Sequence, residues 1–482
     1  MIPAAEDARP DDAALAGRRR WAWIPWAAFV IFFLTAAAAP LPAGLARPGA
    51  FAIAALASAI IFWGSGVQDP SLTGLLLISL IALLGVMSFA DAIAGFGTEF
   101  VWLLVVTFIL ARAMGDVGLG RRIALSLLRR AGSSPSAVLF ALLAAVVVLS
   151  FMIPTAAGRI SAILPVCLGI IEAARLSPGS PFAKAMLIGT SHTSILAGIG
   201  LMTAAGATVY AAGAFESLIG FRWAYLAWLA AFFPVVIIFM LILWRMLLRM
   251  FPPERTELAA SADFVRTELA RLGPLSTPER KMLAVFAGVL ALWILGPRLG
   301  VSTPQAGMLG AIALMLPGIR VLSWERALDA VRWNVIILFG VSLALASALE
   351  RSGAGRWLTD VTLRVLHQPS PVAAALVLAP LVMLVRVGFV NNLGMIAAGL
   401  PLAITLARGW GLNPVWIGMV VVLTAGPGFV LPTQTPTGMI TMGYEHYRIR
   451  DYMRTGAVAS IVLLILTWLA AFLYWPLLGY RP

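Results

Sequence analysis

The sequence predicts an all-α polytopic membrane protein with roughly 11 transmembrane helices, two re-entrant hairpins and an inverted two-fold repeat. Three observations lead to this fold class. Hydrophobic residues make up 61% of the 482 residues and charged residues 11%, whereas soluble domains are about half apolar and a quarter charged. Apolar stretches of about 18 residues, long enough to cross a bilayer as a helix, recur along the chain. The two halves also repeat one order of segments.

Hydropathy places the expected membrane helices in chain order. In the first half the apolar cores lie at 23–39, 51–66, 73–89, 101–112, 137–152, 185–201 and 224–247. In the second half they lie at 282–295, 306–316, 335–349, 372–387, 395–407, 415–431 and 456–478. A few segments are short or interrupted by Gly and Pro, so we do not expect all of them to cross.

The charged residues indicate membrane orientation. The net charge of +13 comes from Arg clusters beside the apolar runs, a pattern typical of membrane topology rather than of nucleic-acid binding. Arg18, Arg19 and Arg20 precede the first span and predict a cytoplasmic N-terminus in a multi-pass protein of the cell inner (plasma) membrane. The single cysteine, Cys167, excludes an intramolecular disulfide and a four-thiol metal site.

A polar stretch divides the chain near its middle and is interpreted as a cytoplasmic linker. Thr277, Pro278 and Glu279 at its end predict a helix start, with Thr277 as the N-cap. The expected organisation is N-terminal scaffold helices (1–98), a first repeat with a re-entrant hairpin (99–248), the linker (249–281), further scaffold helices (282–332) and a second repeat with a hairpin (333–482).

The repeat is visible in the order and register of its parts. Each copy has an apolar helix, a Gly-x-Gly-Arg break, an amphipathic stretch, a Ser-Pro step, another helix and a weakly hydrophobic segment. Gly118 and Gly353 differ by 353 − 118 = 235 positions, and Pro165 and Pro401 by 401 − 165 = 236. By the span count the amphipathic stretches fall on opposite sides, so the copies should be inverted. Matched interrupted segments point to a binding site near the bilayer midplane.

Several passages resemble the divalent anion/sodium symporter family of the ion transporter superfamily, which carries dicarboxylates, citrate and sulfate. They are ARAMGDVGLGRRIAL, LFGVSLALASALERSG, FVLPTQTPTGMI and GYEHYRIRDYMRTG, and the likeness runs from about Val101 onward. The resemblance implies Ser-Asn-Thr motifs at the tips of two re-entrant hairpins, here near 155–174 and 391–407. It also implies unwound Thr-Pro-rich helices opposite the tips, and a homodimer working by an elevator-type movement.

The family's motifs are only partly kept. The first tip keeps a hydroxyl at Thr155, the second keeps its central asparagine at Asn392, and the first-half counterpart of the Thr-Pro motif has lost its proline. By resemblance, we expect substrate contacts at Thr155, Arg159, Asn391, Asn392, Thr435, Pro436 and Thr437. Sodium could bind near Asn392, Thr433 and Thr435, and no other cofactor is expected. Because one sodium site is degraded, sodium symport, proton symport and anion exchange all stay open.

The residue types in these segments suit an anion. A buried dianion needs neutral donors, helix N-termini or cations, since an unpaired buried charge is costly. Arg159 follows Thr155 by four residues within an uncharged stretch, which is expensive unless it faces a cavity or a partner. We hypothesise that Arg159 pairs with a substrate carboxylate or replaces a coupling cation. The alternative is snorkelling, or an ion pair with Glu172 or Glu216.

Four other polar residues carry weaker signals. Arg386 ends an expected span and should reach the interface, with contact to substrate as the alternative. His192 could exchange protons but is more typical of a packing residue, and Glu445 and His446 should lie on a surface loop. No catalytic motif accompanies the three histidines, so no enzyme is expected.

The sequence therefore predicts secondary active transport of small anions, with di- or tricarboxylates as first choice. The alternatives are a permease for sulfate or another inorganic anion, and an efflux-type carrier of the same superfamily. The expected partners are the anionic substrate, membrane lipid and a second copy of the chain.

Overall fold

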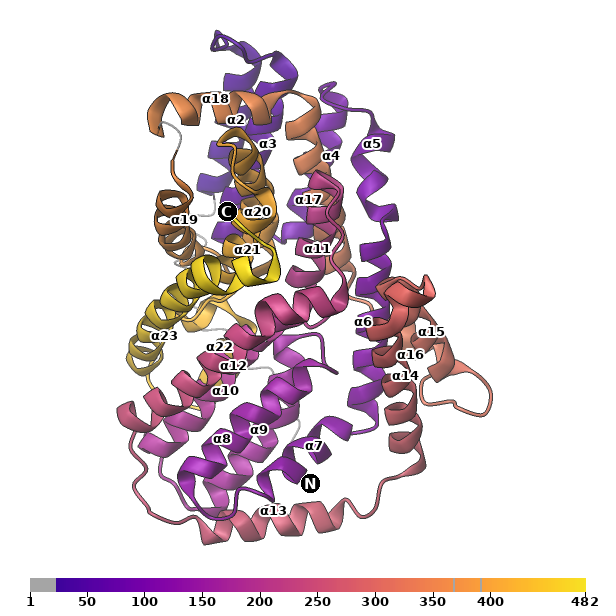
Figure 1. The fold of residues 1–482 in the computed structure, drawn as a ribbon, viewed down its shortest axis with the longest axis vertical. Helices are drawn as coiled ribbons and strands as arrows, with labels where there is room; N and C mark the ends of the chain where they lie inside the picture. The colour runs from indigo at the N-terminus through magenta and orange to yellow at the C-terminus, as the bar shows by residue number, and fades with distance from the viewer. Residues whose placement is uncertain (1–22, 367–368, 391) are drawn as a thin grey trace.

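The computed structural model describes residues 23–366, 369–390 and 392–482, and every regular element in these ranges is helical. Arg18 to Arg20 lie outside the described residues. The N-terminal helices are α2 (Trp23–Ala38), α3 (Arg47–Ser65), α4 (Pro70–Leu83) and α5 (Phe89–Ile93). Figure 1 shows an elongated molecule with these helices at one end and the linker helix α13 (Ala259–Arg271) across the other.

The two repeats have the same order of helices. The first consists of α6 (Glu99–Asp116), α7 (Leu119–Leu128), α8 (Pro135–Ser150), α9 (Ala156–Ala173), α10 (Pro181–Gly200), α11 (Gly206–Ile219) and α12 (Tyr225–Met250). The second consists of α17 (Trp333–Arg351), α18 (Ala354–Leu366), α19 (Pro371–Arg386), α20 (Asn392–Gly409), α21 (Pro414–Ala425), α22 (Pro436–Met442) and α23 (Ile449–Leu469). Between them lie α13, α14 (Thr277–Leu299), α15 (Thr303–Met315) and α16 (Trp324–Ala330).

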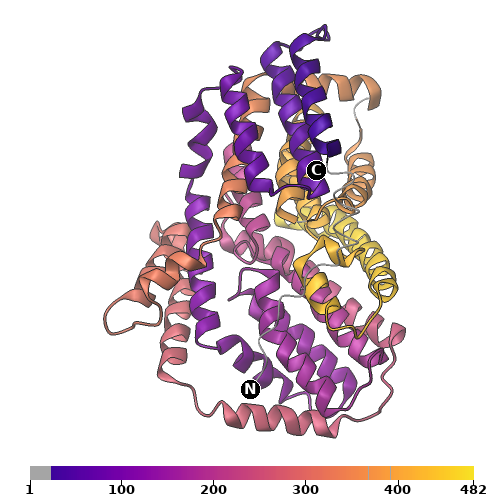
Figure 2. The same ribbon diagram turned by 180° about the vertical axis from the view of Figure 1, so that it is seen from behind.

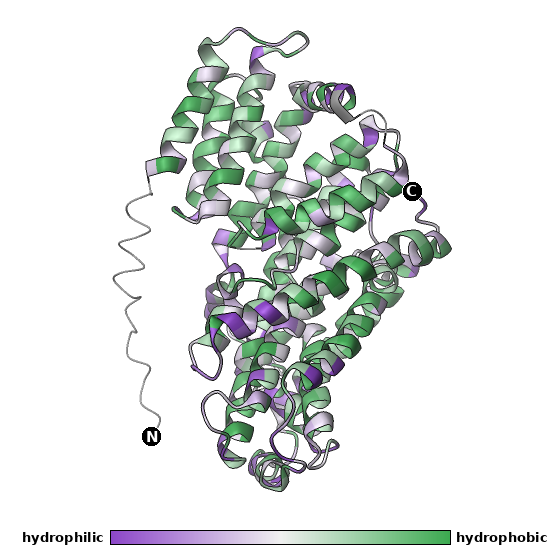
Figure 3. Cartoon of the chain, turned by 90° about the vertical axis from the view of Figure 1, so that its left-hand side faces the viewer, coloured by the Kyte–Doolittle hydropathy of each residue, from purple (hydrophilic) through white to green (hydrophobic). Residues whose placement is uncertain are grey.

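The helices confirm a polytopic membrane fold. Among the described residues, 7 helices are long and apolar enough to span a membrane, or 8 if the bent pair of α5 and α6 counts as one. Other apolar helices have only 10–17 residues, including α8, α19 and α21. Figure 3 shows hydrophobic residues along most of the helices and hydrophilic ones mainly at loops and helix ends.

The hairpins are larger than the sequence predicted. The segments 155–174 and 391–407 correspond only to the second arms, α9 and α20. The first arms are α8 and α19, which the sequence analysis counted as separate spans. Helices α8 and α9 pack together and are joined by the short loop at 151–155. Hydropathy missed this turn because its residues are as apolar as the arm before them.

The repeat register holds in the structure. Helix starts differ by 354 − 119 = 235 for α7 and α18, by 392 − 156 = 236 for α9 and α20, and by 436 − 206 = 230 for α11 and α22. Gly118 and Gly353 each adopt a positive φ, 72° and 75°, which glycine accepts without steric cost. Helices α7 and α18 lie at opposite ends of the molecule (Figure 1, Figure 2), as an inverted repeat requires.

The two halves interlock through their broken helices. In the first half the break separates α10 from α11, and in the second it separates α21 from α22. Helix α22 packs against α9 and α10, while α11 packs against α20 and α21. Each hairpin therefore meets part of the other half's broken helix.

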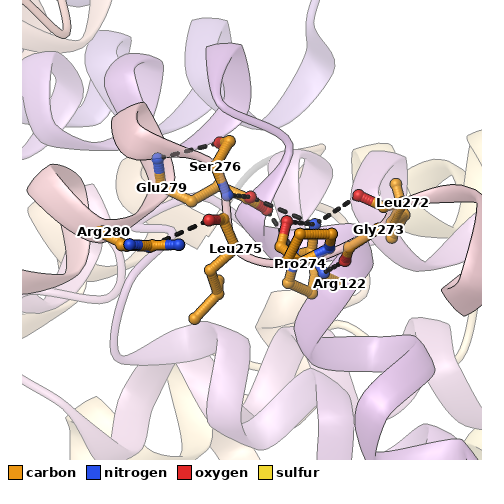
Figure 4. Close-up of polar contacts among 8 residues, drawn as sticks. All are labelled: Arg122, Leu272, Gly273, Pro274, Leu275, Ser276, Glu279 and Arg280. Atoms are coloured by element: carbon orange, nitrogen blue, oxygen red, sulfur yellow. Dashed lines mark hydrogen bonds and ion pairs between the residues drawn. The ribbon is translucent and has the colours of Figure 1, made fainter.

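The linker is held to the first repeat by Arg122 on α7 (Figure 4). Its Nε donates to Glu279 Oε1 at 2.6 Å, and its terminal nitrogens donate to the carbonyl oxygens of Gly273 at 2.7 Å and Leu272 at 3.0 Å. The N-cap of α14 is Ser276 rather than Thr277, because Ser276 and Glu279 form a reciprocal capping box. The start of α14 is thereby tied to α7.

Candidate functional site

Thr155 caps the second arm of the first hairpin. Its backbone is extended, and its Oγ1 accepts a hydrogen bond from the Gly158 N–H at 3.1 Å. A hydroxyl at this position satisfies one of the free N–H groups in the first turn of a helix. The tip of this hairpin is therefore a positively polarised helix start, which suits an anion.

Arg159 is buried beneath this tip, with 1% of its surface exposed. One terminal nitrogen donates to the carbonyl oxygens of Ile153 at 2.7 Å and Ala204 at 2.9 Å. The other donates to the carbonyl of Ser194 at 2.7 Å, and Nε donates to the Ser194 hydroxyl at 3.3 Å. The guanidinium thus joins the hairpin loop to the break between α10 and α11. Its partners are all neutral, so the ion pair with Glu172 or Glu216, which was the alternative to the substrate hypothesis, does not form.

Arg386 fills a corresponding place in the second half. It was expected to reach the membrane interface, but it is 1% exposed. Nη1 donates to the Phe389 carbonyl at 2.5 Å, and Nη2 donates to the Gln434 carbonyl at 3.2 Å. The Gln434 amide returns a hydrogen bond to the Arg386 carbonyl at 3.1 Å. Because the hairpin turns inward here, the end of α19 lies inside the protein.

The two arginine sites are equivalent under the repeat. The hairpin-loop acceptors differ by 389 − 153 = 236 positions and the broken-helix acceptors by 434 − 204 = 230, the offsets of their own segments. A glycine lines each site: a Cβ at Gly198 would lie 2.9 Å from Arg159 Nη2, and one at Gly428 would lie 2.6 Å from Arg386 Nη2. Their separation, 428 − 198 = 230, follows the same register. We call these two places the arginine cradles.

The Thr-Pro segment of the second half forms a buried hydroxyl cluster. Thr435 caps α22 by accepting from the Gly438 N–H at 3.3 Å, and its hydroxyl lies 3.2 Å from that of Thr437. Thr437 in turn accepts from Ser191 of α10 at 3.1 Å. Pro436 and Thr433 are exposed. The structure thus brings Thr435 and Thr437 together, and ties them to the first half.

The second hairpin tip was predicted to contain Asn391 and Asn392. Asn391 lies outside the described residues. Asn392 is the first residue of α20 and is half-buried. The predicted asparagine contacts with substrate, and with sodium, stay predictions.

A cavity of about 530 Å³, which we call the tip cavity, opens at the first hairpin tip. Helix α9 contributes Thr155 and Gly158, and across the cavity lie residues of α6, α7 and the link between α16 and α17. Three of its lining residues are arginines: Arg112, Arg121 and Arg332. Within the described ranges, Arg332 has no ion-pair partner, whereas Arg112 pairs with Asp116 at 2.9 Å and Arg121 pairs with Glu268. The cavity therefore carries one arginine without an ion-pair partner in the described part of the chain, the exposed Arg332, together with one carboxylate, Asp329.

His192 is a packing residue in this conformation. Its ring stacks on Phe429 with centroids 5.0 Å apart and meets Tyr452 edge-on at 4.7 Å. Among the described residues neither ring nitrogen has a hydrogen-bond partner. His192 does not line the tip cavity.

Comparison with known proteins decides the family. A family model described as the sodium:sulfate symporter transmembrane region matches residues 20–480. The chain belongs to the sodium:sulfate symporter family. This confirms the resemblance found in the sequence and the multi-pass membrane character.

Three proteins similar to this member of the sodium:sulfate symporter family match it along nearly their whole length. The chain is 26% identical to the sodium-dependent dicarboxylate transporter SdcS of Staphylococcus saprophyticus, covering 91% of this chain and 88% of the relative. It is 25% identical to the L-tartrate/succinate antiporter of Shigella dysenteriae, covering 96% and 94%. A membrane protein of Cupriavidus necator is 29% identical, covering 94% and 93%. The crystal structure of the Alcanivorax borkumensis YdaH transporter superposes with a TM-score of 0.50 at 16% identity, covering 84% of this chain and 90% of that one, which supports the fold.

Several functional candidates in this member of the sodium:sulfate symporter family escaped the sequence analysis. Nothing in the sequence around Gly198, Gly428 and Ser194 indicates a functional role, and Arg332 is one of many arginines beside the apolar runs. The repeat offset of 230 could have paired the two glycines. The arginines could not be paired by the repeat offset. The position equivalent to Arg386 is 386 − 236 = 150, which is a serine, and the position equivalent to Arg159 is 159 + 236 = 395, which is a methionine.

Proposed function

We propose that this protein is a secondary carrier of small dianions, with C4 dicarboxylates as the first substrate class. The observation that carries the proposal is the cavity at the Thr155 tip, which combines a capped helix start with the unpaired Arg332. A carboxylate fits both features, because helix N–H groups and guanidinium donors are the usual partners of such anions. Two relatives named for dicarboxylate or succinate transport support the substrate class.

We further propose that the carrier alternates access by moving its hairpin-bearing parts against the scaffold. A second cavity of about 440 Å³ is lined by Gly355, Arg356 and Pro401. These are the repeat equivalents of Gly120, Arg121 and Pro165 in the tip cavity. Equivalent cavities in inverted repeats suit a carrier that opens first to one side and then to the other. A homodimer in the plasma membrane is part of this proposal.

Coupling is proposed to be anion exchange without sodium. Carriers commonly bind sodium with carbonyl groups of unwound backbone near the midplane. Here carbonyls of this kind, on Ile153 and Ala204 in one half and on Phe389 and Gln434 in the other, accept from arginines. Each guanidinium supplies the positive charge that a bound cation would supply. This develops the earlier hypothesis that Arg159 replaces a coupling cation.

Charge balance favours exchange over net uptake. Two buried guanidinium groups offset the charge of a bound dianion, so the loaded carrier is nearly neutral. The empty carrier keeps two positive charges in a low-dielectric region, which is costly. We therefore expect the loaded form to change sides readily and the empty form slowly.

The test is uptake of labelled succinate into liposomes containing the purified protein. Vesicles preloaded with succinate are compared with empty ones, in sodium, potassium or choline buffers and with an imposed proton gradient. We expect saturable uptake that needs preloading and is equal in all three cation buffers. Labelled sulfate and citrate run in parallel. Transport of sulfate but not succinate would make the protein an inorganic-anion carrier.

The matched variants are Arg332→Gln and Arg298→Gln. Both arginines are exposed, but Arg332 lines the tip cavity and Arg298 does not. We expect Arg332→Gln to raise the KM for succinate and Arg298→Gln to leave it unchanged. Uptake that requires sodium would contradict the exchange proposal while leaving dicarboxylate transport standing. Absence of uptake of all three anions would contradict the carrier assignment.

A further inference from the structure

A second basic site lies away from the hairpin tips, where α10 and α23 begin. It is a cavity of about 750 Å³, which we call the basic cavity. Its charged lining residues are Lys184, Arg448, Arg450, Arg454, Glu445 and Asp451. Lys184 comes from the first repeat and the arginines come from the second, so the basic cavity joins the two halves.

The arginines of the basic cavity are available to a ligand. Lys184 pairs with Asp451 at 3.0 Å, which neutralises that carboxylate. Arg448, Arg450 and Arg454 are exposed, and within the part of the chain that the structure describes they form no ion pair. Once Asp451 is paired with Lys184, the basic cavity has three arginines and one other carboxylate, Glu445.

His446 does not add to this charge. Burial lowers the pKa of His446 below its usual value, so its ring is neutral at pH 7. The excess positive charge of the basic cavity comes from arginine, and guanidinium groups bind phosphate oxygens through paired hydrogen bonds.

An exposed apolar face begins at the same turn of α23. Its residues recur every three to five positions over the exposed half of the helix: Ile449, Met453, Val458, Ile461, Ile465 and Leu469, each between 38% and 59% exposed. Arg450 and Arg454 directly follow Ile449 and Met453 in the sequence. The cations thus flank the end of a strip that is suited to hydrocarbon chains.

We propose that the basic cavity binds the phosphate of an anionic phospholipid whose acyl chains lie along the apolar face of α23. Basic pockets at the ends of membrane helices are suited to such headgroups. A soluble phosphate would use the arginines alone and leave the adjoining strip unused, so the combination favours a lipid. Since the ligand would contact both α10 and α23, it would hold the two halves together.

The experiment measures thermal unfolding of the full chain in detergent. Phosphatidylglycerol, phosphatidylcholine with the same acyl chains, glycerol 3-phosphate and inorganic phosphate are titrated separately. Lipids retained on the protein are counted by native mass spectrometry. The test variant is Arg448→Gln/Arg450→Gln/Arg454→Gln. The control is Arg255→Gln/Arg298→Gln/Arg320→Gln, which removes the same charge from exposed positions outside the basic cavity.

We expect phosphatidylglycerol to raise the unfolding temperature of the natural chain and of the control in a saturable way, with phosphatidylcholine having no such effect. The test variant should lose this shift and retain fewer phosphatidylglycerol molecules. An unchanged shift and lipid count in the test variant would overturn the proposal. An equal, saturable shift with inorganic phosphate or glycerol 3-phosphate would assign the cavity to a soluble anion instead.

Discussion

Arg159 and Arg386 donate to equivalent carbonyl groups of the two repeats although they occupy non-equivalent positions in the chain. Arg159 belongs to the second arm of its hairpin, whereas Arg386 is the last residue of the first arm. Both bridge a hairpin loop to a broken helix. The place of a positive charge is thus shared by the repeats, while the residue that supplies it differs.

Removing either arginine should make the protein respond to sodium. Arg159→Ala and Arg386→Ala each leave buried carbonyl groups without a donor, at about 1–3 kcal/mol per group. We expect a lower unfolding temperature that sodium partly restores and choline does not, because sodium can bind the vacated carbonyls. Arg298→Ala serves as control, since Arg298 is exposed. Sodium stabilising the natural chain as much as the variants would contradict the prediction.

The two cradle glycines should not tolerate a methyl group. In Gly198→Ala and Gly428→Ala the new Cβ would lie 2.9 Å and 2.6 Å from a guanidinium nitrogen. We expect a loss of about 1–3 kcal/mol of stability from this crowding, together with slower succinate exchange. Gly288→Ala, in α14 with open space around the added carbon, should be neutral or slightly stabilising. Cradle variants as stable and active as Gly288→Ala would show that the guanidinium groups are not tightly held.

The cap of the first hairpin can be tested with two substitutions of similar size. Thr155→Val keeps the shape of the side chain but loses the acceptor for the Gly158 N–H, at about 1 kcal/mol. Thr155→Ser keeps the acceptor. We expect Thr155→Val to raise the KM for succinate severalfold and Thr155→Ser to stay near the natural value. Equal KM values for both variants would show that the Thr155 cap does not contribute to substrate binding.

The ion pair between α7 and the linker should contribute measurably to stability. Arg122 and Glu279 are 12% and 5% exposed at their side chains, and a charged hydrogen bond in such a setting is worth about 1.5–3 kcal/mol. A double-mutant cycle measures their coupling from the unfolding free energies of four proteins: the natural chain, Arg122→Gln, Glu279→Gln and the double variant. Additive effects of the two single changes would show that the pair does not hold the linker.

Much of the architecture was visible in the sequence. The composition required a membrane protein, and the register of Gly118 with Gly353 located two copies of one unit. The same reasoning placed the hairpins one arm too short, since a loop such as 151–155 is as apolar as the helices beside it. The predicted N-cap of α14, Thr277, was wrong by one residue. Ser276 and Thr277 are both good N-cap residues, and only the hydrogen bonds with Glu279 select Ser276.

The candidate site was less predictable. Thr155 and Thr435 were predicted from the resemblance to the family's motifs, and Arg159 because it is charged within an uncharged stretch; their contact with substrate stays a prediction. Arg386 was assigned to the interface because it ends an apolar run, and nothing in the linear pattern says that the run turns back inside the protein. The arginines also lie at unrelated offsets, so a comparison of the repeats could not pair them.

The sequence by itself determined the membrane class, the inverted repeat and the family, since these depend on hydropathy, spacing and motifs that lie along the chain. Only the tertiary structure decided what the buried arginines contact. Their partners are backbone carbonyl groups, which every residue carries and which no side-chain pattern distinguishes. The carbonyls become available where helices break and hairpins turn, so each cradle exists only once the hairpin and the broken helix of its own half have packed together.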